Sequence, residues 1–196
     1  MDRDRLRSLL AASKVGIAGA GGLGSTCAAS LVRAGLKSIV VADFDTVSET
    51  NLDRQFYFAR QIGMAKVVAL AENLKAIDPS VEIEAHSLRL DPANLPLLFS
   101  GCDILVEAVD DAETKAMIIE TALTCFPKAH VVAASGLAGI GSLEKLKVVH
   151  RGKFHICGDF ENEVRTDNPP FAPRVSIVAN MEADIVLQIL VAEADR

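Results

Sequence analysis

The sequence predicts an α/β fold in which helices cover both faces of a mostly parallel, twisted sheet. Short apolar runs of strand type alternate with amphipathic helical patterns along most of the chain. A glycine-rich turn joins the first of these strands directly to a helix. Near the C-terminus the pattern changes, and two strand-like runs at 145–149 and 153–156 predict a short antiparallel extension.

Each element follows from a local pattern. Apolar runs predict parallel strands at 15–18, 38–42, 81–85, 103–109 and 130–134. Apolar residues at helical spacing predict helices at 2–12, 22–34, 63–77, 91–99, 112–125 and 174–192. Gly35 is suited to end the second helix, and Pro79 stops the third. The apolar face of the first helix needs a cover, either from its own domain or from a second subunit.

Length and composition favour one domain over 1–196. The chain of 196 residues can bury one substantial core, and half of its residues are apolar. The longest stretch without a regular pattern is 159–173, which is polar and contains proline. We expect this stretch to form a mobile crossover loop, because loops of that length are usually functional or mobile.

Charge and cysteine usage exclude several classes. The net charge of −6 and the pI near 5.2 argue against a surface for DNA or RNA. The four cysteines are scattered singly, without the paired spacing of a zinc site, which favours reduced thiols and a cytoplasmic location. No secretory signal and no run near 18 apolar residues is present, so we expect no membrane partner.

The glycine-rich turn marks a place where a phosphate would bind. Gly19, Gly21 and Gly24 have the spacing G-x-G-x-x-G directly after the first strand. The first permits a tight turn, the second lets the backbone approach a phosphate, and the third lets the helix pack closely on the strand. The helix that begins near Gly22 directs free N–H groups toward the same space. The alternative is a tight turn that binds nothing.

Two neighbouring features refine this reading. Asp43 ends the second strand, the usual position of a carboxylate that hydrogen-bonds a ribose hydroxyl, although it could merely cap a turn. Ser25 stands where a Walker A loop needs its lysine, so a bound triphosphate must obtain positive charge elsewhere. The expected fold is therefore Rossmann-like, with a nucleotide at the carboxyl ends of the strands.

Ordered motifs resemble the ThiF/MoeB-type adenylyltransferases, in the superfamily that includes the ubiquitin-activating enzymes. They are GAGGLGS at 19–25, DFDTV at 43–47 with NLDRQ at 51–55, GMAK at 63–66 and AVDD at 108–111. The resemblance runs from about residue 15 to the last helix. The short chain and the wording EAVDDAETKAM at 107–117 are most similar to the compact ThiF-like branch linked to thiamin biosynthesis.

This resemblance implies ATP-dependent adenylation. The C-terminal glycine carboxylate of a small ubiquitin-like sulfur carrier (ThiS-like) attacks the α-phosphate of ATP and releases pyrophosphate, and family members are usually homodimers. The implied nucleotide contacts are Gly19, Gly21, Gly22, Gly24, Asp43, Asn51, Arg54 and Lys66. The implied catalytic residues are Arg54, Lys66 and Asp110, and Asp110 would hold Mg²⁺.

The same residues have structural alternatives. Arg54 could be a solvated loop cation. Lys66 opens a helix, where a cation is slightly unfavourable, so its presence favours a ligand role. Asp110 and Asp111 could both serve the start of the following helix, and we assign Asp111 to the helix cap and Asp110 to the metal.

Departures from the family pattern limit the resemblance. Asp111 and Lys115 stand where relatives often have asparagine and arginine. The zinc-binding cysteine pairs of many relatives are missing, so no zinc is expected. Val164 occupies the place of the crossover-loop thiol and leaves Cys157 as the nearby candidate for sulfur chemistry, although a structural thiol is the favoured interpretation. The N-terminal RYxRQ element is also missing, and its arginine could be replaced by Arg3, Arg5 or Arg7.

Two other functions stay open. An NAD-dependent oxidoreductase would use the same glycine turn and Asp43, but the single tyrosine, Tyr57, is followed four positions later by Gln61 rather than a lysine. A non-catalytic partner that binds a carrier on the same fold is suggested by the altered Asp111 and Lys115. The sequence does not name the carrier or its pathway.

Overall fold

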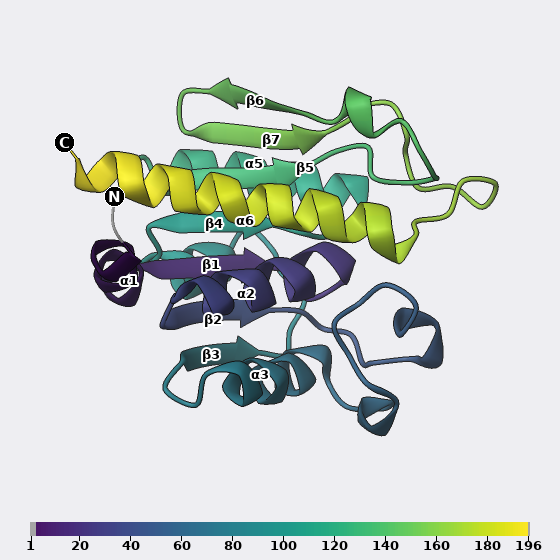
Figure 1. The fold of residues 1–196 in the computed structure, drawn as a ribbon, viewed down its shortest axis with the longest axis horizontal. Helices are drawn as coiled ribbons and strands as arrows, with labels where there is room; N and C mark the ends of the chain where they lie inside the picture. The colour runs from purple at the N-terminus through teal and green to yellow at the C-terminus, as the bar shows by residue number, and fades with distance from the viewer. Residues whose placement is uncertain (1–2, 196) are drawn as a thin grey trace.

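The computed structural model describes residues 3–195 as one seven-stranded sheet with helices on both faces (Figure 1). The strands lie in the order β3-β2-β1-β4-β5-β7-β6. All neighbouring pairs are parallel except β6 and β7, which are antiparallel. The strand bounds are β1 Lys14–Ala18, β2 Ser38–Ala42, β3 Glu82–His86, β4 Ile104–Glu107, β5 His130–Ala134, β6 Lys147–Arg151 and β7 Phe154–Gly158.

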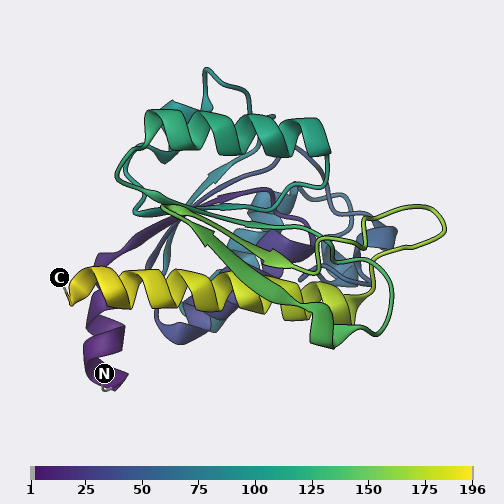
Figure 2. The ribbon, with the colours of Figure 1, turned by 90° about the horizontal axis from the view of Figure 1, so that it is seen from above.

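Two layers of helices enclose the sheet, as the view from above shows (Figure 2). Buried side chains of α1, α2, α3 and α6 form a core on one face, and those of α4 and α5 form a core on the other. The helix bounds are α1 Arg3–Ala12, α2 Gly22–Ala34, α3 Lys66–Ile77, α4 Leu95–Phe99, α5 Ala112–Cys125 and α6 Ala172–Ala194. Three short 3-10 helices lie in loops: η1 Glu49–Asn51, η2 Ala59–Gln61 and η3 Leu143–Lys145. The expected fold class, including the C-terminal antiparallel pair, is confirmed.

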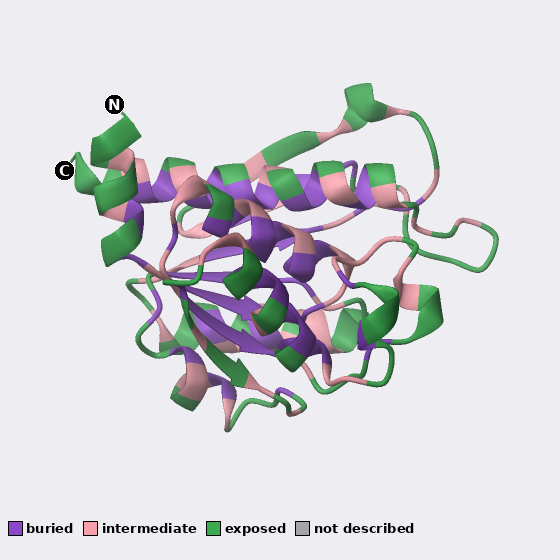
Figure 3. Ribbon diagram, turned by 60° about the horizontal axis from the view of Figure 1, so that its bottom comes forward, coloured by how far each residue is buried: buried purple, intermediate pink, exposed green. Residues whose placement is uncertain are grey.

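The central strands are buried on both faces, and the helices turn their apolar sides inward (Figure 3). This pattern is typical of parallel sheets, whose crossover helices cover both surfaces. It explains why β1, β2, β4 and β5 read as nearly continuous apolar runs in the sequence.

Two predicted helices begin later than expected. The helix predicted at 63–77 begins at Lys66, because Gly63 has a φ of +88° and Met64 N–H donates to the Gln61 carbonyl instead of a helical partner. The helix predicted at 91–99 is reduced to Leu95–Phe99. There the Asp91 carboxylate accepts the N–H groups of Ala93 and Asn94 in an Asx turn. The other predicted boundaries agree within two residues.

The last helix passes a length and composition test for a membrane span, with a mean hydropathy of 1.7 over its most apolar window. Half of that window is buried inside the protein, and α6 packs on α2, β5 and β7. It also carries the buried charged side chains of Arg174 and Glu182. Its packing is therefore that of a core helix.

The cover of the N-terminal helix comes partly from its own domain. Leu10 is fully buried, α1 packs on α6, and Arg5 forms an ion pair with Asp195. Residue 2, with which the predicted helix starts, lies outside the described residues. Figure 1 shows α1 beside the start of β1, at the opposite end of the sheet from the glycine turn.

Candidate functional site

The predicted nucleotide-binding turn lies at the switch point of the sheet. Strands β1 and β4 are neighbours, but α2 follows β1 on one face and α5 follows β4 on the other. In open α/β sheets, ligands bind outside the carboxyl ends of the strands at such a point. The loops after β1, β2 and β4 are therefore the segments in which residues of a ligand site are expected.

The three motif glycines meet three different steric conditions. Gly19 has a φ of +102°, and a Cβ there would lie 2.7 Å from the Ala108 carbonyl oxygen. A Cβ on Gly24 would lie 1.9 Å from the Gly19 carbonyl oxygen, so α2 could not approach β1 as closely. Nothing lies within 4 Å of the position where Gly21 would carry a Cβ. The turn is thus tight at both ends and open in the middle, where a ligand can reach the backbone.

The helix that follows has an uncapped start. Gly21 is the N-cap of α2 and offers no side chain, so the N–H groups of Gly22 and Leu23 in the first helical turn have no side-chain cap. Ser25 is fully buried, and its hydroxyl accepts the N–H of Phe56 at 3.0 Å. The residue in place of the Walker lysine therefore ties the loop after β2 to α2.

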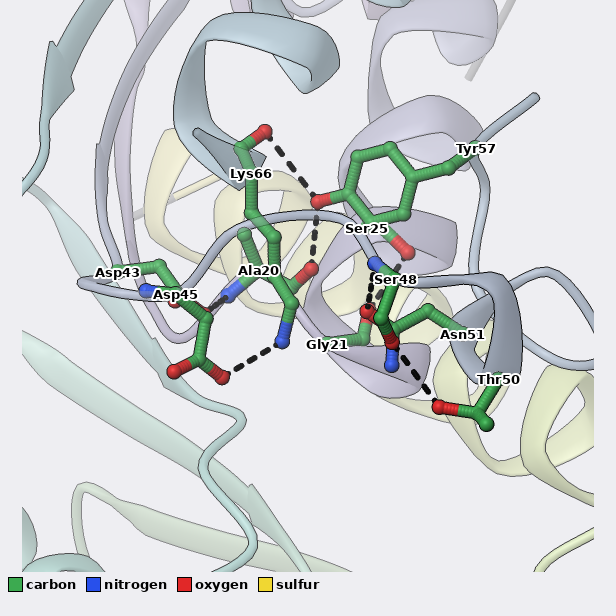
Figure 4. A network of polar contacts seen from close by, with 10 residues as sticks. All are labelled: Ala20, Gly21, Ser25, Asp43, Asp45, Ser48, Thr50, Asn51, Tyr57 and Lys66. Carbon is green, nitrogen blue, oxygen red and sulfur yellow. Dashed lines mark hydrogen bonds and ion pairs between the residues drawn. The ribbon is translucent and has the colours of Figure 1, made fainter. Parts of the chain in front are cut away.

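Asp43 is held beside this turn by backbone groups (Figure 4). One carboxylate oxygen accepts the Ala20 N–H at 2.6 Å, and the other accepts the Asp45 N–H at 2.8 Å. The Asp43 N–H donates to the carbonyl of His86 at the end of β3. These bonds fix the carboxylate and leave each oxygen a lone pair that can accept a ribose hydroxyl.

Tyr57 joins the glycine turn to the start of α3. Its hydroxyl lies 2.6 Å from the Ala20 carbonyl oxygen and 3.3 Å from that of Lys66. Burial, followed by the charges of Asp43 and Asp45, raises the pKa of Tyr57 far above its usual value. The hydroxyl therefore stays a hydrogen-bond donor. Sequence reasoning missed this structural role, and the signal was a lone tyrosine in the loop between Asp43 and Lys66.

Lys66 lies next to this cluster, with its charge already paired. Its side chain is only 7% exposed, and Nζ lies 2.8 Å from the Asp45 carboxylate (Figure 4). Asp45 is half exposed, so the ion pair faces the edge of the site. The net positive charge that Lys66 adds for phosphates is smaller than the sequence alone suggests.

Asn51 and Arg54 belong to the loop after β2. The Asn51 side-chain oxygen accepts the Ser48 N–H at 3.0 Å, and no residue within 3–195 accepts from its amide nitrogen. Arg54 donates to the Thr50 carbonyl at 3.1 Å and to the Asp53 carboxylate at 2.7 Å. A Cβ on Gly22 would lie 3.3 Å from the Arg54 carbonyl oxygen, so this arginine lies against the start of α2.

The loop after β4 packs against the glycine turn from the other side. The Ala108 N–H donates to the Ala18 carbonyl at 2.8 Å. The Asp111 side chain accepts the Thr114 N–H at 2.7 Å, which confirms it as the helix cap. Asp110 is exposed and makes no ion pair with any described residue. Within 3–195, no group of three or more histidine, cysteine or acidic side chains could hold a metal ion by itself.

Lys115 has a structural partner rather than a free charge. Its ammonium group pairs with Glu107, a fully buried carboxylate at the end of β4. The other Glu107 oxygen accepts the Val109 N–H at 2.8 Å. The residue that departs from the family pattern thus fixes the loop that carries Asp110, and sequence reasoning missed Glu107 because it lies inside an apolar run.

The crossover region follows β7, and its backbone bonds to the loop that follows β5. The Asp159 carboxylate pairs with Arg174 at the start of α6, and both side chains are buried. Val164 is exposed in this loop. Cys157 is fully buried, and burial, with a smaller contribution from Glu182, raises the pKa of its thiol far above the usual value. A thiol of this kind is a poor nucleophile.

The structure therefore brings most predicted residues to one end of the sheet. The glycines, Asp43, Arg54 and Lys66 are linked by the contacts above, and Asp110 is two residues beyond the carbonyl that touches Gly19. The arginines of α1 are not part of this group, because that helix lies at the opposite end of the sheet (Figure 1). Within one chain they cannot reach the turn.

Comparison with known families agrees with this geometry. The model of the ThiF family matches residues 2–196. The chain belongs to the ThiF family. The UBA4 adenylyltransferase and sulfurtransferase of Candida glabrata is 35% identical to this ThiF-family chain over 146 residues, which are 74% of the chain and 33% of the relative.

A second relative gives the same picture. The probable adenylyltransferase/sulfurtransferase MoeZ of Mycobacterium tuberculosis is 33% identical over 112 residues, or 57% of this chain and 29% of MoeZ. The ThiF-family chain spans about a third of the length of these curated relatives.

Solved structures support the fold. Escherichia coli TcdA, a tRNA N6-threonylcarbamoyladenosine dehydratase solved with AMP, superposes with a TM-score of 0.88 at 21% identity. The match covers 98% of the ThiF-family chain and 91% of TcdA. Escherichia coli MccB, solved with AMPCPP and MccA, gives a TM-score of 0.73 at 20% identity over 94% of this chain and 58% of MccB.

Proposed function

We propose that this ThiF-family chain is an ATP-dependent adenylyltransferase. Its second substrate would be the C-terminal glycine carboxylate of a small ubiquitin-like sulfur-carrier protein of the ThiS type, and its pathway thiamin biosynthesis. The observation that carries the proposal is the convergence of the open glycine turn, the fixed Asp43 carboxylate and the cations Arg54 and Lys66. The names of the relatives support it, since both are adenylyltransferases.

Further support comes from the ligands of the structural neighbours. TcdA has been solved with AMP and with ATP, and MccB with AMPCPP together with MccA. Binding of adenine nucleotides by neighbours of the same fold supports ATP as the nucleotide of this chain. The fold alone does not choose the second substrate, which rests on the resemblance to the compact ThiF-like branch.

Nucleotide binding follows from the described contacts. The uncapped N–H groups at the start of α2 would donate to phosphate oxygens, aided by the positive end of the helix dipole. Arg54, lying against Gly22, would add charge-assisted bonds to the same phosphates. Asp43 would accept the ribose hydroxyls, and the free amide nitrogen of Asn51 would donate to a phosphate.

Adenylation then joins two anions. A carboxylate oxygen of the carrier forms a bond to the α-phosphorus, and the bond from that phosphorus to the bridging oxygen of pyrophosphate breaks. The leaving pyrophosphate carries away the electron pair. Arg54 and Lys66 would offset the charge that develops on the phosphate oxygens during this step.

Asp110 fits a magnesium ligand. Mg²⁺ usually takes one or two carboxylates and completes its shell with waters and substrate phosphates, so an isolated exposed carboxylate at the switch point is a suitable donor. When bound, the ion would neutralise charge on the α-phosphate and on pyrophosphate. The Glu107–Lys115 pair would keep the loop that carries Asp110 in place.

We also propose a homodimer. Lys66 is paired with Asp45, and Arg54 is partly paired with Asp53, so one chain supplies few free cations to a triphosphate. A further arginine could come from a second copy, whose α1 carries Arg3 and Arg7 besides Arg5, which is paired with Asp195.

The test is ATP–pyrophosphate exchange that depends on a carrier ending in Gly-Gly. We expect exchange with wild-type protein and its loss in Asp110→Ala, with the melting temperature unchanged. Asp184→Ala serves as the control, because Asp184 is an exposed carboxylate on α6 bonded to Gln188. Absence of exchange with every such carrier contradicts the proposal, and retained exchange in Asp110→Ala removes that residue from the catalytic set.

A non-catalytic partner subunit is the second candidate. It is favoured by one observation, the pairing of Lys66 with Asp45, which reduces the charge available to phosphates. Carrier binding without nucleotide turnover would establish it. An NAD-dependent oxidoreductase would instead show preference for NADH over ATP in direct titration.

A further inference from the structure

The backbone of Ala20, between the first two glycines of the turn, is held from both sides by side chains of the loop after β2 (Figure 4). Its N–H donates to the Asp43 carboxylate at 2.6 Å, and its carbonyl oxygen lies 2.6 Å from the Tyr57 hydroxyl. Ala20 itself is fully buried. The middle of the glycine turn is therefore fixed by two hydrogen bonds that come from outside it.

The Tyr57 hydroxyl acts as the donor in its bond to the turn. Tyr57 is only 5% exposed, and its ring belongs to the core that α2 and α3 share. Because burial and the charges of Asp43 and Asp45 raise its pKa far above the usual value, the oxygen keeps its proton. The contact with the Ala20 carbonyl is 2.6 Å long and the contact with the Lys66 carbonyl 3.3 Å, so the stronger bond goes to the turn.

The segment that carries Tyr57 is anchored independently of the turn's carbonyl. The Phe56 N–H donates to the Ser25 hydroxyl at 3.0 Å, and the Phe56 carbonyl accepts from the Asn73 side chain of α3 at 2.8 Å. The Tyr57 N–H donates to the Gln55 carbonyl at 2.8 Å. The tyrosine is thus tied to both α2 and α3, and its hydroxyl is a fixed point against which the Ala20 carbonyl is held.

The bond to the Ala20 carbonyl also sets the direction of the next N–H group. The peptide bond between Ala20 and Gly21 is trans and planar, so the Gly21 N–H points away from the Ala20 carbonyl and from Tyr57. Within 3–195 no residue accepts this N–H. Nothing lies within 4 Å of the position where Gly21 would carry a Cβ. The hydroxyl therefore keeps an unpaired backbone donor on the open side of the turn.

A different hydroxyl fixes the N–H group that follows. The Gly21 carbonyl accepts the Ser25 hydroxyl at 2.6 Å and the Ser25 N–H at 3.0 Å. By the same planar geometry, the Gly22 N–H points away from Ser25 and out of the start of α2. The directions of two successive N–H groups thus depend on two separate contacts, that of Gly21 on Tyr57 and that of Gly22 on Ser25.

We propose that Tyr57 is a positioning residue of the nucleotide site, whose hydroxyl holds the Ala20 carbonyl so that the Gly21 N–H is directed at a phosphate oxygen of ATP. The inference rests on the proposed function for the presence of a phosphate at the turn. A hydrogen bond from an N–H group to a phosphate is charge-assisted and stronger than one between neutral groups. A donor that is held in place before the phosphate arrives loses little conformational freedom on binding.

The test removes the hydroxyl and keeps the ring. In calorimetric titrations of the whole protein with ATP and Mg²⁺, Tyr57→Phe should bind ATP about tenfold more weakly than wild type, the scale of one hydrogen bond to a charged group. Ser13→Ala is the matched control, because it removes a buried hydroxyl bonded to the Leu9 carbonyl at 2.9 Å, in the segment before β1 at the other end of the sheet. Its ATP affinity should equal that of wild type, and both variants should melt cooperatively.

Amide chemical shifts separate this role from a general loss of structure. In ¹⁵N–¹H correlation spectra of wild type, saturating ATP should move the amide protons of Gly21 and Gly22 downfield, as expected for donors to phosphate. In Tyr57→Phe the shift of Gly22 should persist, because Ser25 sets the direction of that group. The shift of Gly21 should be lost.

Four results overturn the role of Tyr57. They are equal ATP affinity in wild type and Tyr57→Phe, no shift of Gly21 in wild type, a shift of Gly21 that persists in the variant, and loss of both shifts in the variant. The last result would mean that the hydroxyl maintains the whole turn rather than one donor. In each of these cases ATP binding by wild type leaves the adenylyltransferase proposal standing, whereas wild type that binds no ATP overturns both.

Discussion

Removal of the Lys115 ammonium group should destabilise the protein in a pH-dependent manner. The Glu107 side chain is 0% exposed, and its two oxygens are bonded to Lys115 and to the Val109 N–H. Burial raises the pKa of Glu107, and Lys115 opposes that rise. Lys115→Met keeps the apolar stem of the side chain but leaves a buried carboxylate without its cation.

The expected cost is about 3–4 kcal/mol of unfolding free energy at pH 7, the usual effect of breaking a buried ion pair on one side. Without Lys115 the folded pKa of Glu107 rises further above that of the unfolded chain. A raised carboxyl pKa gives stability that is present below the unfolded value and is lost as pH rises. The cost of Lys115→Met should therefore be small near pH 4.5 and grow toward pH 7.5.

Urea unfolding followed by far-UV circular dichroism at several pH values measures this cost. The double variant Glu107→Leu with Lys115→Met removes both charges and should recover most of the lost stability. Lys145→Met is the control, because the ion pair of Lys145 with Glu161 is exposed and its loss should leave the curve unchanged. If the urea unfolding curve of Lys115→Met coincides with that of Lys145→Met at pH 7.5, the reasoning is refuted.

Three further results are expected. Gly24→Ala should lower the free energy of unfolding by about 1–3 kcal/mol and weaken ATP binding, because its Cβ would lie 1.9 Å from the Gly19 carbonyl oxygen. Gly21→Ala, with open space around its Cβ, should fold like wild type. Equal melting temperatures of the two variants would count against this. Burial raises the pKa of Glu182 well above its usual value, and neither carboxylate oxygen has a partner among the described residues. Wild type should thus lose stability as pH rises above about 4.5. Glu182→Gln should be more stable than wild type by about 1–3 kcal/mol at pH 8. A stability difference between the two proteins that is the same at pH 4 and pH 8 would contradict this. Burial and two neighbouring imidazoles lower the pKa of His155 to about 4 from 6.5, so the stability that it contributes is present above pH 6.5 and is lost as pH falls toward 4. This loss in the free energy of unfolding should be about 1–2 kcal/mol after solvent screening. The urea midpoint of His155→Phe should therefore change less between pH 7 and pH 4.5 than that of wild type. Equal changes in the two proteins would exclude this role.

Patterns within a few residues predicted the elements of this fold well. The strands at 38–42 and 130–134 and the helix at 112–125 have the predicted bounds. Asp111 caps its helix as its position before an apolar run indicates. These features depend on backbone conformations and hydrogen bonds between near neighbours, so the local sequence contains the information that specifies them.

Predictions failed where a loop competes with a helix. Gly63 and Met64 read as the start of a helix, but their backbone groups bond to the preceding loop, where the N–H of Gly63 donates to Val47. The alternative partners come from residues distant in the sequence. Helical periodicity gives no sign of them.

The local sequence by itself predicted the fold class, the glycine turn after the first strand, and the candidate ribose-binding and cationic residues Asp43, Arg54 and Lys66. Only the tertiary structure decided how much charge those cations have left, because Lys66 meets Asp45 and Lys115 meets Glu107 across different elements. It also placed the Tyr57 hydroxyl against the Ala20 carbonyl. Such contacts depend on the order of the strands in the sheet, because that order decides which loops become neighbours. No short sequence pattern encodes the strand order.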